Sequence, residues 1–234
     1  MARVIAALIR HGDYQQLADT PSALQPFPLN DEGRAQAREA IQELTEIRQQ
    51  HGWVLHPLID TSRLLRAWQT ASLMANEIAA GSQLDLRIES YDDLAERSVG
   101  SAANMTIRQI ESVIAMDPRF PDPPADWKSN SHYRLPLQGA ESLLDAGRRV
   151  ADHLEQSLRQ LAGQCQVDTL KLFVGHGAAF RHAAHHLGIL TFEQIAQLSM
   201  FHCRPVFIER LDSRHWRHIA GDWKLRKRHE SFTD

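Results

Sequence analysis

Short apolar runs alternate along the chain with longer amphipathic segments. The runs are brief, and several are rich in β-branched residues, so they predict strands; they cover Val4–Ile9, Leu55–Asp60, Leu84–Glu89, Thr169–Val174, Val206–Leu211 and His215–Ala220. In the amphipathic segments apolar residues recur about every 3.6 positions, which predicts helices; these cover about Asp31–Gln50, Arg63–Ala80, Thr106–Ala115, the stretch from Gln138–Ser142 to Ala162, and Ala178–Leu187. Because strands alternate with helices, we expect an α/β fold: a three-layer α/β/α sandwich with a mostly parallel central sheet.

Capping residues and core positions refine two of these helices. Asn30 precedes the first helix and predicts its N-cap, because an Asn side chain can accept a hydrogen bond from the first turn. Ser62 or Thr61 can cap the second helix in the same way. Within that second helix, Leu65 and Trp68 are candidate core residues.

One proline-rich stretch interrupts the alternation. Residues Asp117–Pro136 are rich in Pro and polar residues, which predicts an excursion over the surface. The chain shows no internal repeat and no clean boundary, and 234 residues fit one large α/β domain. We therefore expect a single domain over residues 1–234, with a cap-like insertion around residues 100–137.

Composition excludes several classes of function. The 26 basic and 29 acidic residues leave a net charge of −3, so no overall basic field attracts nucleic acid or an anionic membrane. No apolar run approaches the roughly 20 residues that span a bilayer, and the N-terminal run is too short for a signal peptide. Two cysteines, Cys165 and Cys203, cannot form a disulfide framework and favour a reducing, cytoplasmic location. We expect no nucleic-acid or membrane partner; the oligomeric state stays open, with a homodimer as one option.

Two strand ends carry the same signal. The first strand leads into Arg10-His11-Gly12, and the strand Thr169–Val174 leads into Gly175-His176-Gly177. Glycine lets the chain turn sharply and lets a ligand approach the backbone. Ligands of parallel α/β sheets bind outside the carboxyl ends of the strands, so His11 and His176 share one crevice if these strands are neighbours.

Arginine and glutamate follow two other strand ends. Arg63 and Arg66 lie in the first turns of the second helix, three positions apart and roughly on one face. Glu96 and Arg97 follow the strand Leu84–Glu89, although Glu89, Asp92 and Asp93 are also nearby. From the residues alone, neither arginine is favoured over the other, and Glu96 is one of several acidic candidates.

This set of residue types suits phosphoryl transfer. Guanidinium groups bind phosphate in a bidentate manner and stay charged. An imidazole with one unprotonated nitrogen is a competent nucleophile, and its other nitrogen would donate to a backbone carbonyl. A carboxyl group can protonate the leaving oxygen and then activate water. We therefore expect phosphoryl transfer through a phosphohistidine, with no metal and no cofactor.

The ordered motifs resemble those of the histidine phosphatase superfamily, which includes the cofactor-dependent phosphoglycerate mutases. The segments that carry the resemblance are Arg10–Gly12, Leu29–Ala37, Thr61–Ala71 with its Ser-x-x-x-Arg-Ala-x-x-Thr-Ala pattern, Leu94–Gly100, Gly139–Ser142 with one extra alanine, and Val174–Gly177. Their order and spacing extend from residue 4 to about residue 211. A lone Arg-His-Gly is weak evidence, whereas the ordered set is strong.

The resemblance implies a fold like that of the phosphoglycerate mutases and a role for each matched residue. His11 would be the phosphorylated nucleophile, His176 would hydrogen-bond the transferred group, and Glu96 would donate and accept protons. Arg10 and Arg66 would hold the phosphate, and it is the resemblance that selects Arg66 over Arg63. Arg97 would contact substrate or pair with a carboxylate. The implied enzyme is a histidine phosphatase, a phosphoric monoester hydrolase acting on a phosphorylated small molecule or a phosphoprotein.

Two alternatives remain beside the phosphatase. A phosphoglycerate mutase-type isomerase uses the same catalytic residues, but mutases carry a small hydroxyl residue near Tyr14 and an asparagine shortly after, and both are missing here. The pair of arginines that mutases use for the substrate carboxylate is also missing from Asp117–Pro136. A non-catalytic phosphate-binding module is the second alternative, and the intact set of histidines, Arg66 and Glu96 argues against it.

The carboxyl-terminal third is rich in histidine without matching a metal motif. His182, His185 and His186 have helical spacing, but no carboxylate or cysteine is interleaved, which favours a solvated or stacking face over a metal site. The basic tail Lys224–His229 is expected to be solvated, although it could also fold over the phosphate pocket. The physiological substrate and the role of this region do not follow from the sequence.

Overall fold

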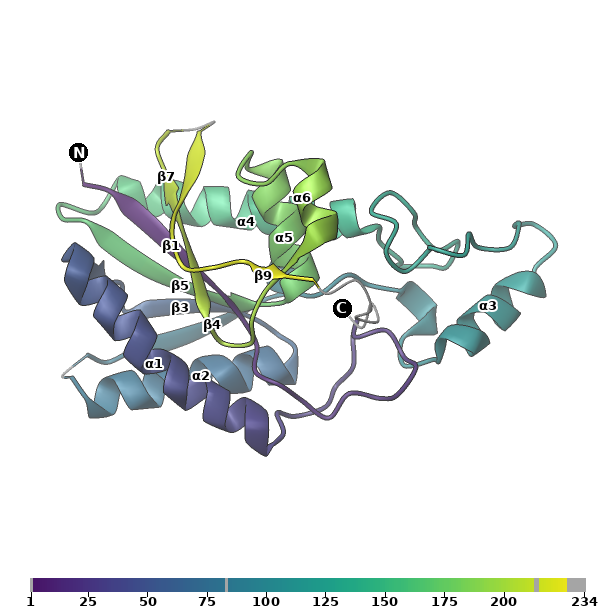
Figure 1. The fold of residues 1–234 in the computed structure, drawn as a ribbon, viewed down its shortest axis with the longest axis horizontal. Helices are drawn as coiled ribbons and strands as arrows, with labels where there is room; N and C mark the ends of the chain where they lie inside the picture. Colours follow the sequence, from purple (N-terminus) through teal and green to yellow (C-terminus); the bar gives the residue numbers. More distant parts are fainter. Residues whose placement is uncertain (1, 83, 213–214, 227–234) are drawn as a thin grey trace.

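The computed structural model of the protein describes residues 2–82, 84–212 and 215–226. Its centre is a seven-stranded sheet in the order β4-β3-β5-β1-β7-β8, with β2 also pairing with β5 (Figure 1). The strands are β1 (Val4–Arg10), β2 (Val54–Leu55), β3 (Leu58–Ser62), β4 (Arg87–Tyr91), β5 (Thr169–Gly175), β7 (Pro205–Arg210) and β8 (Trp216–Ala220). Strands β1 to β5 pair in parallel, whereas β7 and β8 are antiparallel additions at one edge.

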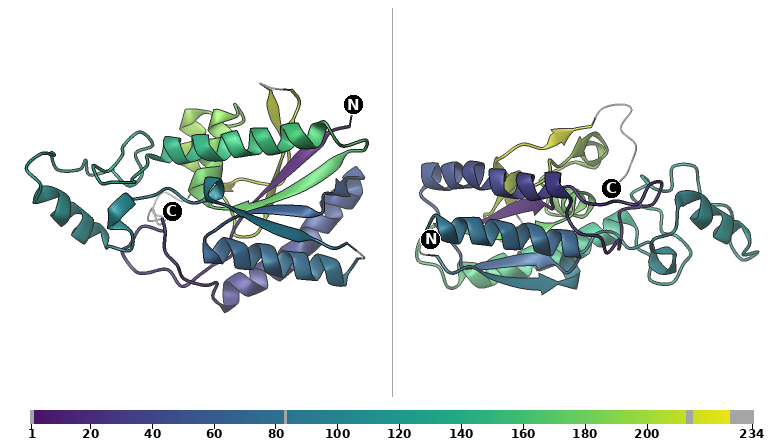
Figure 2. Two further views of the ribbon diagram at one scale, coloured as in Figure 1. Left: turned by 180° about the vertical axis from the view of Figure 1, so that it is seen from behind. Right: turned by 90° about the horizontal axis from the view of Figure 1, so that it is seen from below.

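Helices cover both faces of this sheet (Figure 2). Helices α1 (Asp31–His51) and α2 (Leu65–Ala80) pack on one face, around an apolar core that includes Leu44 and Met74. Helices α4 (Leu143–Ala162) and α5 (Gly177–His186) pack on the other face, around a second core. The three-layer α/β/α sandwich with a mostly parallel sheet is therefore confirmed.

The pairing of β1 with β5 brings two distant parts of the chain to one edge of the sheet. Arg10 lies opposite Gly175 in the parallel register, and the His11 amide donates to the Gly175 carbonyl at 2.9 Å. Because parallel strands end at the same edge, His11 and His176 leave the sheet side by side. The two strands are neighbours, which was the condition for His11 and His176 to share one crevice.

The start of α1 packs directly on the turn that follows β1. Asn30 caps this helix as predicted, since its Oδ1 accepts from the Gly33 amide at 2.8 Å. A Cβ atom on Gly12 would lie 2.5 Å from the Gly33 carbonyl oxygen, and one on Gly33 would lie even closer to the backbone of Asp13. Glycine at both positions therefore allows two backbones to touch beside His11.

The second helix departs from the prediction in its cap and its buried face. The N-cap is Leu64, whose side chain cannot accept a hydrogen bond. Ser62 Oγ accepts from the Leu64 amide at 3.2 Å rather than from an amide of the first turn, and Thr61 Oγ1 donates to the Val174 carbonyl. Leu65 and Trp68 were expected in the core, but both are exposed. The buried face of α2 is instead the one that carries Arg66, which is fully buried, together with Thr70 and Met74.

Several short elements escaped the sequence analysis. Pro57, which has no N–H, separates β2 from β3, so the predicted strand Leu55–Asp60 is two strands. Helix α6 (Phe192–Gln197) follows α5, and strand β6 (Leu198–Ser199) pairs with β9 (Lys224–Leu225) in a separate two-stranded sheet. The beginning of the basic tail thus forms a strand, in which Leu225 is 73% exposed; residues 227–229 lie outside the described residues.

A long segment between β4 and α4 projects beyond the end of the sheet (Figure 1). It contains two short 3₁₀ helices, η1 (Asp92–Leu94) and η2 (Gly100–Ala102), and helix α3 (Ile107–Ala115). A small apolar cluster of its own, including Trp127 and Ile110, holds it together. The insertion expected around residues 100–137 lies within this segment between β4 and α4.

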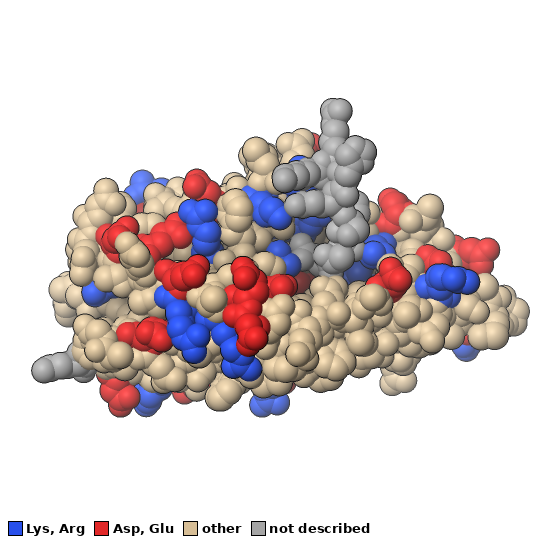
Figure 3. Space-filling view, turned by 60° about the horizontal axis from the view of Figure 1, so that its bottom comes forward, with Lys and Arg blue, Asp and Glu red and all other residues tan. Residues whose placement is uncertain are grey.

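The charges of the surface are mixed. On the face seen in Figure 3, Lys and Arg alternate with Asp and Glu over the sheet and its helices, in keeping with a net charge of −3. Among the residues that the structure describes, no helix is long and apolar enough to cross a membrane.

Candidate active site

His11 is buried, and its hydrogen bonds define its protonation state. Its Nδ1 lies 2.7 Å from the Gly12 carbonyl oxygen, which can only accept, so Nδ1 carries the proton. Its Nε2 lies 3.2 Å from Arg66 Nε, which can only donate, so Nε2 holds a lone pair. Burial first, then the charges of Arg66, His176, Arg10 and His202, hold the pKa of His11 well below its usual range. The ring is therefore a neutral imidazole at physiological pH, with a lone pair on Nε2.

Arg66 joins the two histidines to the loop that follows β1. Its Nη1 donates to the Gln25 carbonyl at 2.8 Å and its Nη2 to the Ala23 carbonyl at 3.0 Å. The same Nη2 lies 3.3 Å from His176 Nδ1. By contrast, Arg63 is exposed and pairs with Asp92 at 3.6 Å. Of the two arginines that the sequence left open, the structure brings Arg66 to His11.

His176 completes the pair of imidazoles. Its ring centroid lies 5.1 Å from that of His11. Because Nδ1 accepts from Arg66, the neutral ring carries its proton on Nε2, which donates to Ser62 Oγ at 2.8 Å. Burial and the charges of Arg66 and Arg10 lower the pKa of His176 well below its usual range. Both imidazoles are thus neutral and share one guanidinium.

Arg10, the last residue of β1, lies near both histidines, since its charge lowers the pKa of each. Its Nη1 donates to the Met200 carbonyl at 3.1 Å. A Cβ atom on Gly177 would lie 3.1 Å from Arg10 Cδ, so the glycine after His176 makes room for this side chain. The structure therefore places two guanidinium groups beside the paired histidines, as a phosphate site requires.

Burial separates Glu96 from the other acidic candidates. Glu96 is 4% exposed, whereas Glu89, Asp92 and Asp93 lie on the surface. Its Oε1 accepts from the backbone amide of Arg97 at 2.9 Å. Burial lowers the pKa of Arg66 and raises that of Tyr14, and the charge of Glu96 opposes the first shift and adds to the second, so the carboxylate lies near the same pocket. Arg97 follows it, is also buried, and lies over the Trp127 ring.

The structure adds residues that the sequence analysis missed. Tyr14 packs edge-on against His11, lies under Arg66, and bonds Ser22 through its hydroxyl. Ser62 was assigned only to a cap, yet it is the partner of His176. The only signal for these two residues was their position in the chain. Tyr14 lies shortly after β1, and Ser62 is the last residue of β3.

His202 is a third imidazole that no motif indicated. Its Nδ1 donates to the His11 carbonyl at 2.6 Å, and its ring centroid lies 5.7 Å from that of His11. The next residue, Cys203, has a φ of 60°, and its amide donates to the Arg10 carbonyl at 2.8 Å. A strained backbone that persists beside a functional residue indicates that the surroundings enforce it.

The histidine trio on α5 fits the predicted solvated or stacking face only in part, since His185 makes ring contacts with His186 and Phe192 while His182 departs from it. His182 is buried, donates from Nδ1 to the Ala178 carbonyl at 2.7 Å, and lies 3.0 Å from Ser131 Oγ. Burial lowers its pKa to about 3. Within the described part of the chain, no three His, Cys, Asp or Glu residues are grouped so that they could hold a metal ion.

Comparisons with known proteins agree with this geometry. A model of the histidine phosphatase superfamily (branch 1) matches residues 6–220. A search of curated protein sequences finds no match. The mycobacterial glucosyl-3-phosphoglycerate phosphatase has a similar structure, with a TM-score of 0.68, 21% identity, and 97% of this chain and 99% of that chain covered.

Two further solved structures share the fold. The phosphoglycerate mutase of Bacillus anthracis gives a TM-score of 0.70 at 16% identity, over 94% of this chain and 92% of that chain. The α-ribazole phosphatase of Shigella flexneri gives a TM-score of 0.66 at 18% identity, over 95% and 94%. At these identities the likeness concerns the fold, whereas the family model spans most of the chain. The protein therefore belongs to the histidine phosphatase superfamily.

Proposed function

We propose that the protein is a phosphoric monoester hydrolase that works through a phosphohistidine on His11, without metal. The observation that carries this proposal is the protonation state of His11. Its Nε2 lone pair is directed at the guanidinium of Arg66, while Nδ1 is committed to a backbone carbonyl. A neutral imidazole beside a fixed cation is suited to attack a phosphoryl group whose charge that cation neutralises.

In the first half-reaction, a phosphate monoester enters between the imidazoles and the guanidinium groups of Arg10 and Arg66. His11 Nε2 forms a bond to phosphorus while the bond from phosphorus to the ester oxygen breaks. Glu96, in its protonated form, gives its proton to the leaving oxygen, which departs as an alcohol. His176 hydrogen-bonds the transferred group when its Nε2–H turns from Ser62 Oγ, its partner without substrate, to an oxygen of that group.

In the second half-reaction, water replaces the alcohol. Glu96, now a carboxylate, takes a proton from water as the oxygen attacks phosphorus. The bond between phosphorus and Nε2 breaks, the electron pair returns to His11, and inorganic phosphate leaves. The buried position of Glu96 near Arg66 supports this double role, because it places the carboxyl group beside the pocket that holds the phosphoryl group.

Features of the loop after β1 and of the insertion favour hydrolysis over isomerisation. Tyr14 fills the space beside His11, where mutases have a small hydroxyl residue. The arginines of Asp117–Pro136 are exposed and already paired, Arg119 with Asp117 and Arg134 with Asp145. Neither is placed to hold a substrate carboxylate while the substrate turns over.

The substrate class is a phosphorylated small molecule. Two similar structures are named for phosphatases of such compounds, glucosyl-3-phosphoglycerate and α-ribazole phosphate. We further propose that residues of about 100–137 act as a cap over the site and that the enzyme works in a reducing, cytoplasmic setting, since Cys165 and Cys203 are both free thiols.

Turnover of 4-nitrophenyl phosphate tests the proposal. We expect wild-type activity to survive excess chelator and His11→Asn to abolish it, while Arg63→Gln leaves it unchanged. Parallel assays of 3-phosphoglycerate should release phosphate without forming 2-phosphoglycerate. Activity that chelator removes, or isomer formed faster than phosphate, would contradict the proposal.

A further inference from the structure

Arg66 is a buried cation that neutral groups hold in place. Its guanidinium is fully buried and donates to the backbone carbonyls of Ala23 and Gln25 and to the two imidazoles of the site. Among the residues that the structure describes, no carboxylate forms an ion pair with it. A buried charge without a counter-ion is costly, so the neutral partners of Arg66 have to be well placed.

One of these neutral partners is the ring of Tyr14. The Cζ atom of Arg66 lies over the face of this ring, 4.6 Å from its centroid. The face of an aromatic ring attracts a cation, and the attraction is stronger when both groups are removed from water. Tyr14 is itself buried, and burial raises the pKa of its phenol, so the ring is neutral at physiological pH. The contact therefore stabilises Arg66 without adding a negative charge.

The Tyr14 ring is fixed at both ends. Its backbone forms an antiparallel bridge with Leu29, and its hydroxyl lies 2.9 Å from Ser22 Oγ. Ser22 Oγ also accepts from Arg66 Nη2 at 3.4 Å. The ring stands edge-on to His11, with centroids 5.3 Å apart and an angle of 84° between the planes. A ring held in this way sets where the guanidinium above it lies, with Nε directed at His11.

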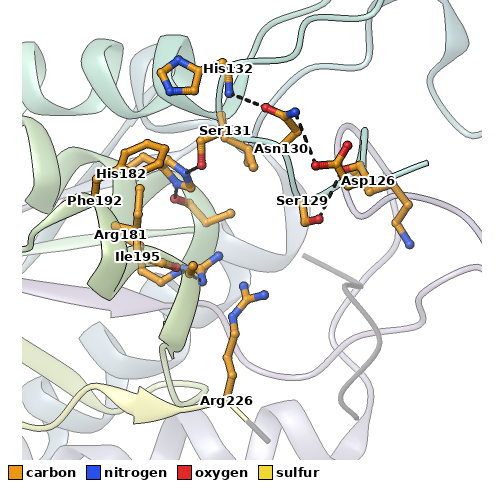
Figure 4. Close-up of a pocket in the computed structure, with 14 residues that line it drawn as sticks. Asp126, Ser129, Asn130, Ser131, His132, Arg181, His182, Phe192, Ile195 and Arg226 are labelled. Atoms are coloured by element: carbon orange, nitrogen blue, oxygen red, sulfur yellow. Dashed lines mark hydrogen bonds between the residues drawn. The ribbon is translucent and has the colours of Figure 1, made fainter. Parts of the chain in front are cut away.

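A direct contact with the body of a substrate would be a different role for Tyr14. The cavity of about 320 Å³ in Figure 4 lies between the loop Asp126–His132 and helices α5 and α6. The residues that line it come from the insertion, from helices α4 to α6 and from the end of the described chain, and Tyr14 is not among them. The hydroxyl of Tyr14 is already bonded to Ser22. Its ring therefore acts on the groups that it contacts inside the site, and Arg66 is the charged one.

We propose that Tyr14 is a positioning residue, whose ring face holds Arg66 beside the phosphoryl group by a cation–π contact that keeps the guanidinium charge available to the substrate. The inference rests on the proposed phosphatase and specifies what sets the strength of its phosphate site. A carboxylate in the same place would neutralise Arg66 and compete with the phosphate, whereas a ring face does neither. Ser22 assists by holding the phenol hydroxyl.

Fluorinated side chains at this position test the contact. Fluorine withdraws electron density from the face of a ring and scarcely changes its size, so a ring with one, two or three fluorines weakens a cation–π contact in steps. Tyr14→Phe is the reference and should lose about threefold in kcat/KM for 4-nitrophenyl phosphate, because the bond to Ser22 is gone. Replacement of Tyr14 by the fluorinated phenylalanines should reduce kcat/KM further at each step, by about tenfold over the series.

The same substitution at another tyrosine provides the control. The ring of Tyr91 contacts His153 and its hydroxyl donates to Glu89, so Tyr91 lies outside the site. Tyr91→Leu should leave kcat/KM unchanged, whereas Tyr14→Leu should reduce it about thirtyfold, since the whole ring face is lost. A loss in Tyr14→Leu that the fluorinated series does not reproduce would show that Tyr14 only fills space, and would overturn the proposal.

Binding of inorganic phosphate separates this inference from the proposed phosphatase. Isothermal titration calorimetry should give a Kd for inorganic phosphate that rises along the fluorinated series as kcat/KM falls. If the wild type did not hydrolyse the ester but the Kd still rose along the series, the phosphatase alone would be overturned. If the wild type hydrolysed the ester and neither quantity changed along the series, the role of Tyr14 alone would be overturned.

Discussion

Arg66 is the side chain on which the site depends most, and Arg66→Lys tests that dependence. The substitution keeps the positive charge but replaces a planar fork with one nitrogen. The Arg66 fork donates to Gln25 O at 2.8 Å, to Ala23 O at 3.0 Å, and to both histidines. A single ammonium cannot reach all four acceptors, which lie on two sides of the guanidinium.

The magnitude follows from the acceptors that lose a donor. At least one buried carbonyl of the loop after β1 is left unsatisfied, at a cost of about 1–3 kcal/mol. For a chain of this size, that cost lowers the melting temperature by roughly 2–12 °C. Loss of the phosphate-holding fork should also reduce kcat/KM for 4-nitrophenyl phosphate about 100- to 1,000-fold.

Thermal unfolding followed by circular dichroism, with steady-state kinetics alongside, measures both effects. Arg63→Lys is the matched control, since Arg63 lies three positions earlier, just before α2 begins, and is exposed in an ion pair with Asp92. We expect it to be neutral in both assays. If Arg66→Lys were equally neutral, the assignment of Arg66 as the bridge between loop and histidines would be refuted.

Three further predictions follow from the same contacts. Asparagine places Nδ2 where His202 has Nδ1, so the His202→Asn variant should keep the hydrogen bond to the His11 carbonyl and a kcat near that of wild type. The His202→Gln variant should lose this bond and show a kcat about fivefold lower in steady-state kinetics. The pKa values of His11 and His176 are lowered in the folded chain, so only the unfolded chain takes up these protons below about pH 6.5. The free energy of unfolding should therefore fall as the pH drops from 7.5 to 5.5. A melting temperature that stays constant over this range would contradict the prediction. Glu96→Gln should reduce kcat/KM for phenyl phosphate about tenfold more than for 4-nitrophenyl phosphate, because a poor leaving group needs the proton most; equal losses would remove Glu96 from this role.

The layers of the fold follow from local pattern. Apolar runs and amphipathic segments predicted the strands β1 and β5 and the helices on both faces, because burial of one face determines each element. The short pieces β6, β9 and α6 escaped, because their formation depends on tertiary contacts rather than on their own periodicity.

The site divides in a similar way. The histidines could be placed together from the rule for strand ends, since β1 and β5 are neighbours. Residue reasoning could not choose between Arg63 and Arg66, because both were expected on one helix turn, whereas the structure has Arg63 before α2 begins and Arg66 inside it against the loop after β1. His202 could not be found at all, since it reaches His11 from a segment 191 positions away.

The most direct test of the account is to trap the phosphoryl group. The enzyme would be mixed with 4-nitrophenyl phosphate, quenched in alkali, and digested for mass spectrometry under conditions that preserve phosphohistidine. We predict one phosphate, on His11, that is stable in alkali, lost in acid, and absent from the His11→Asn variant. Phosphate on another residue, or rapid turnover with no phosphorylated His11 at any time, would contradict the central claim.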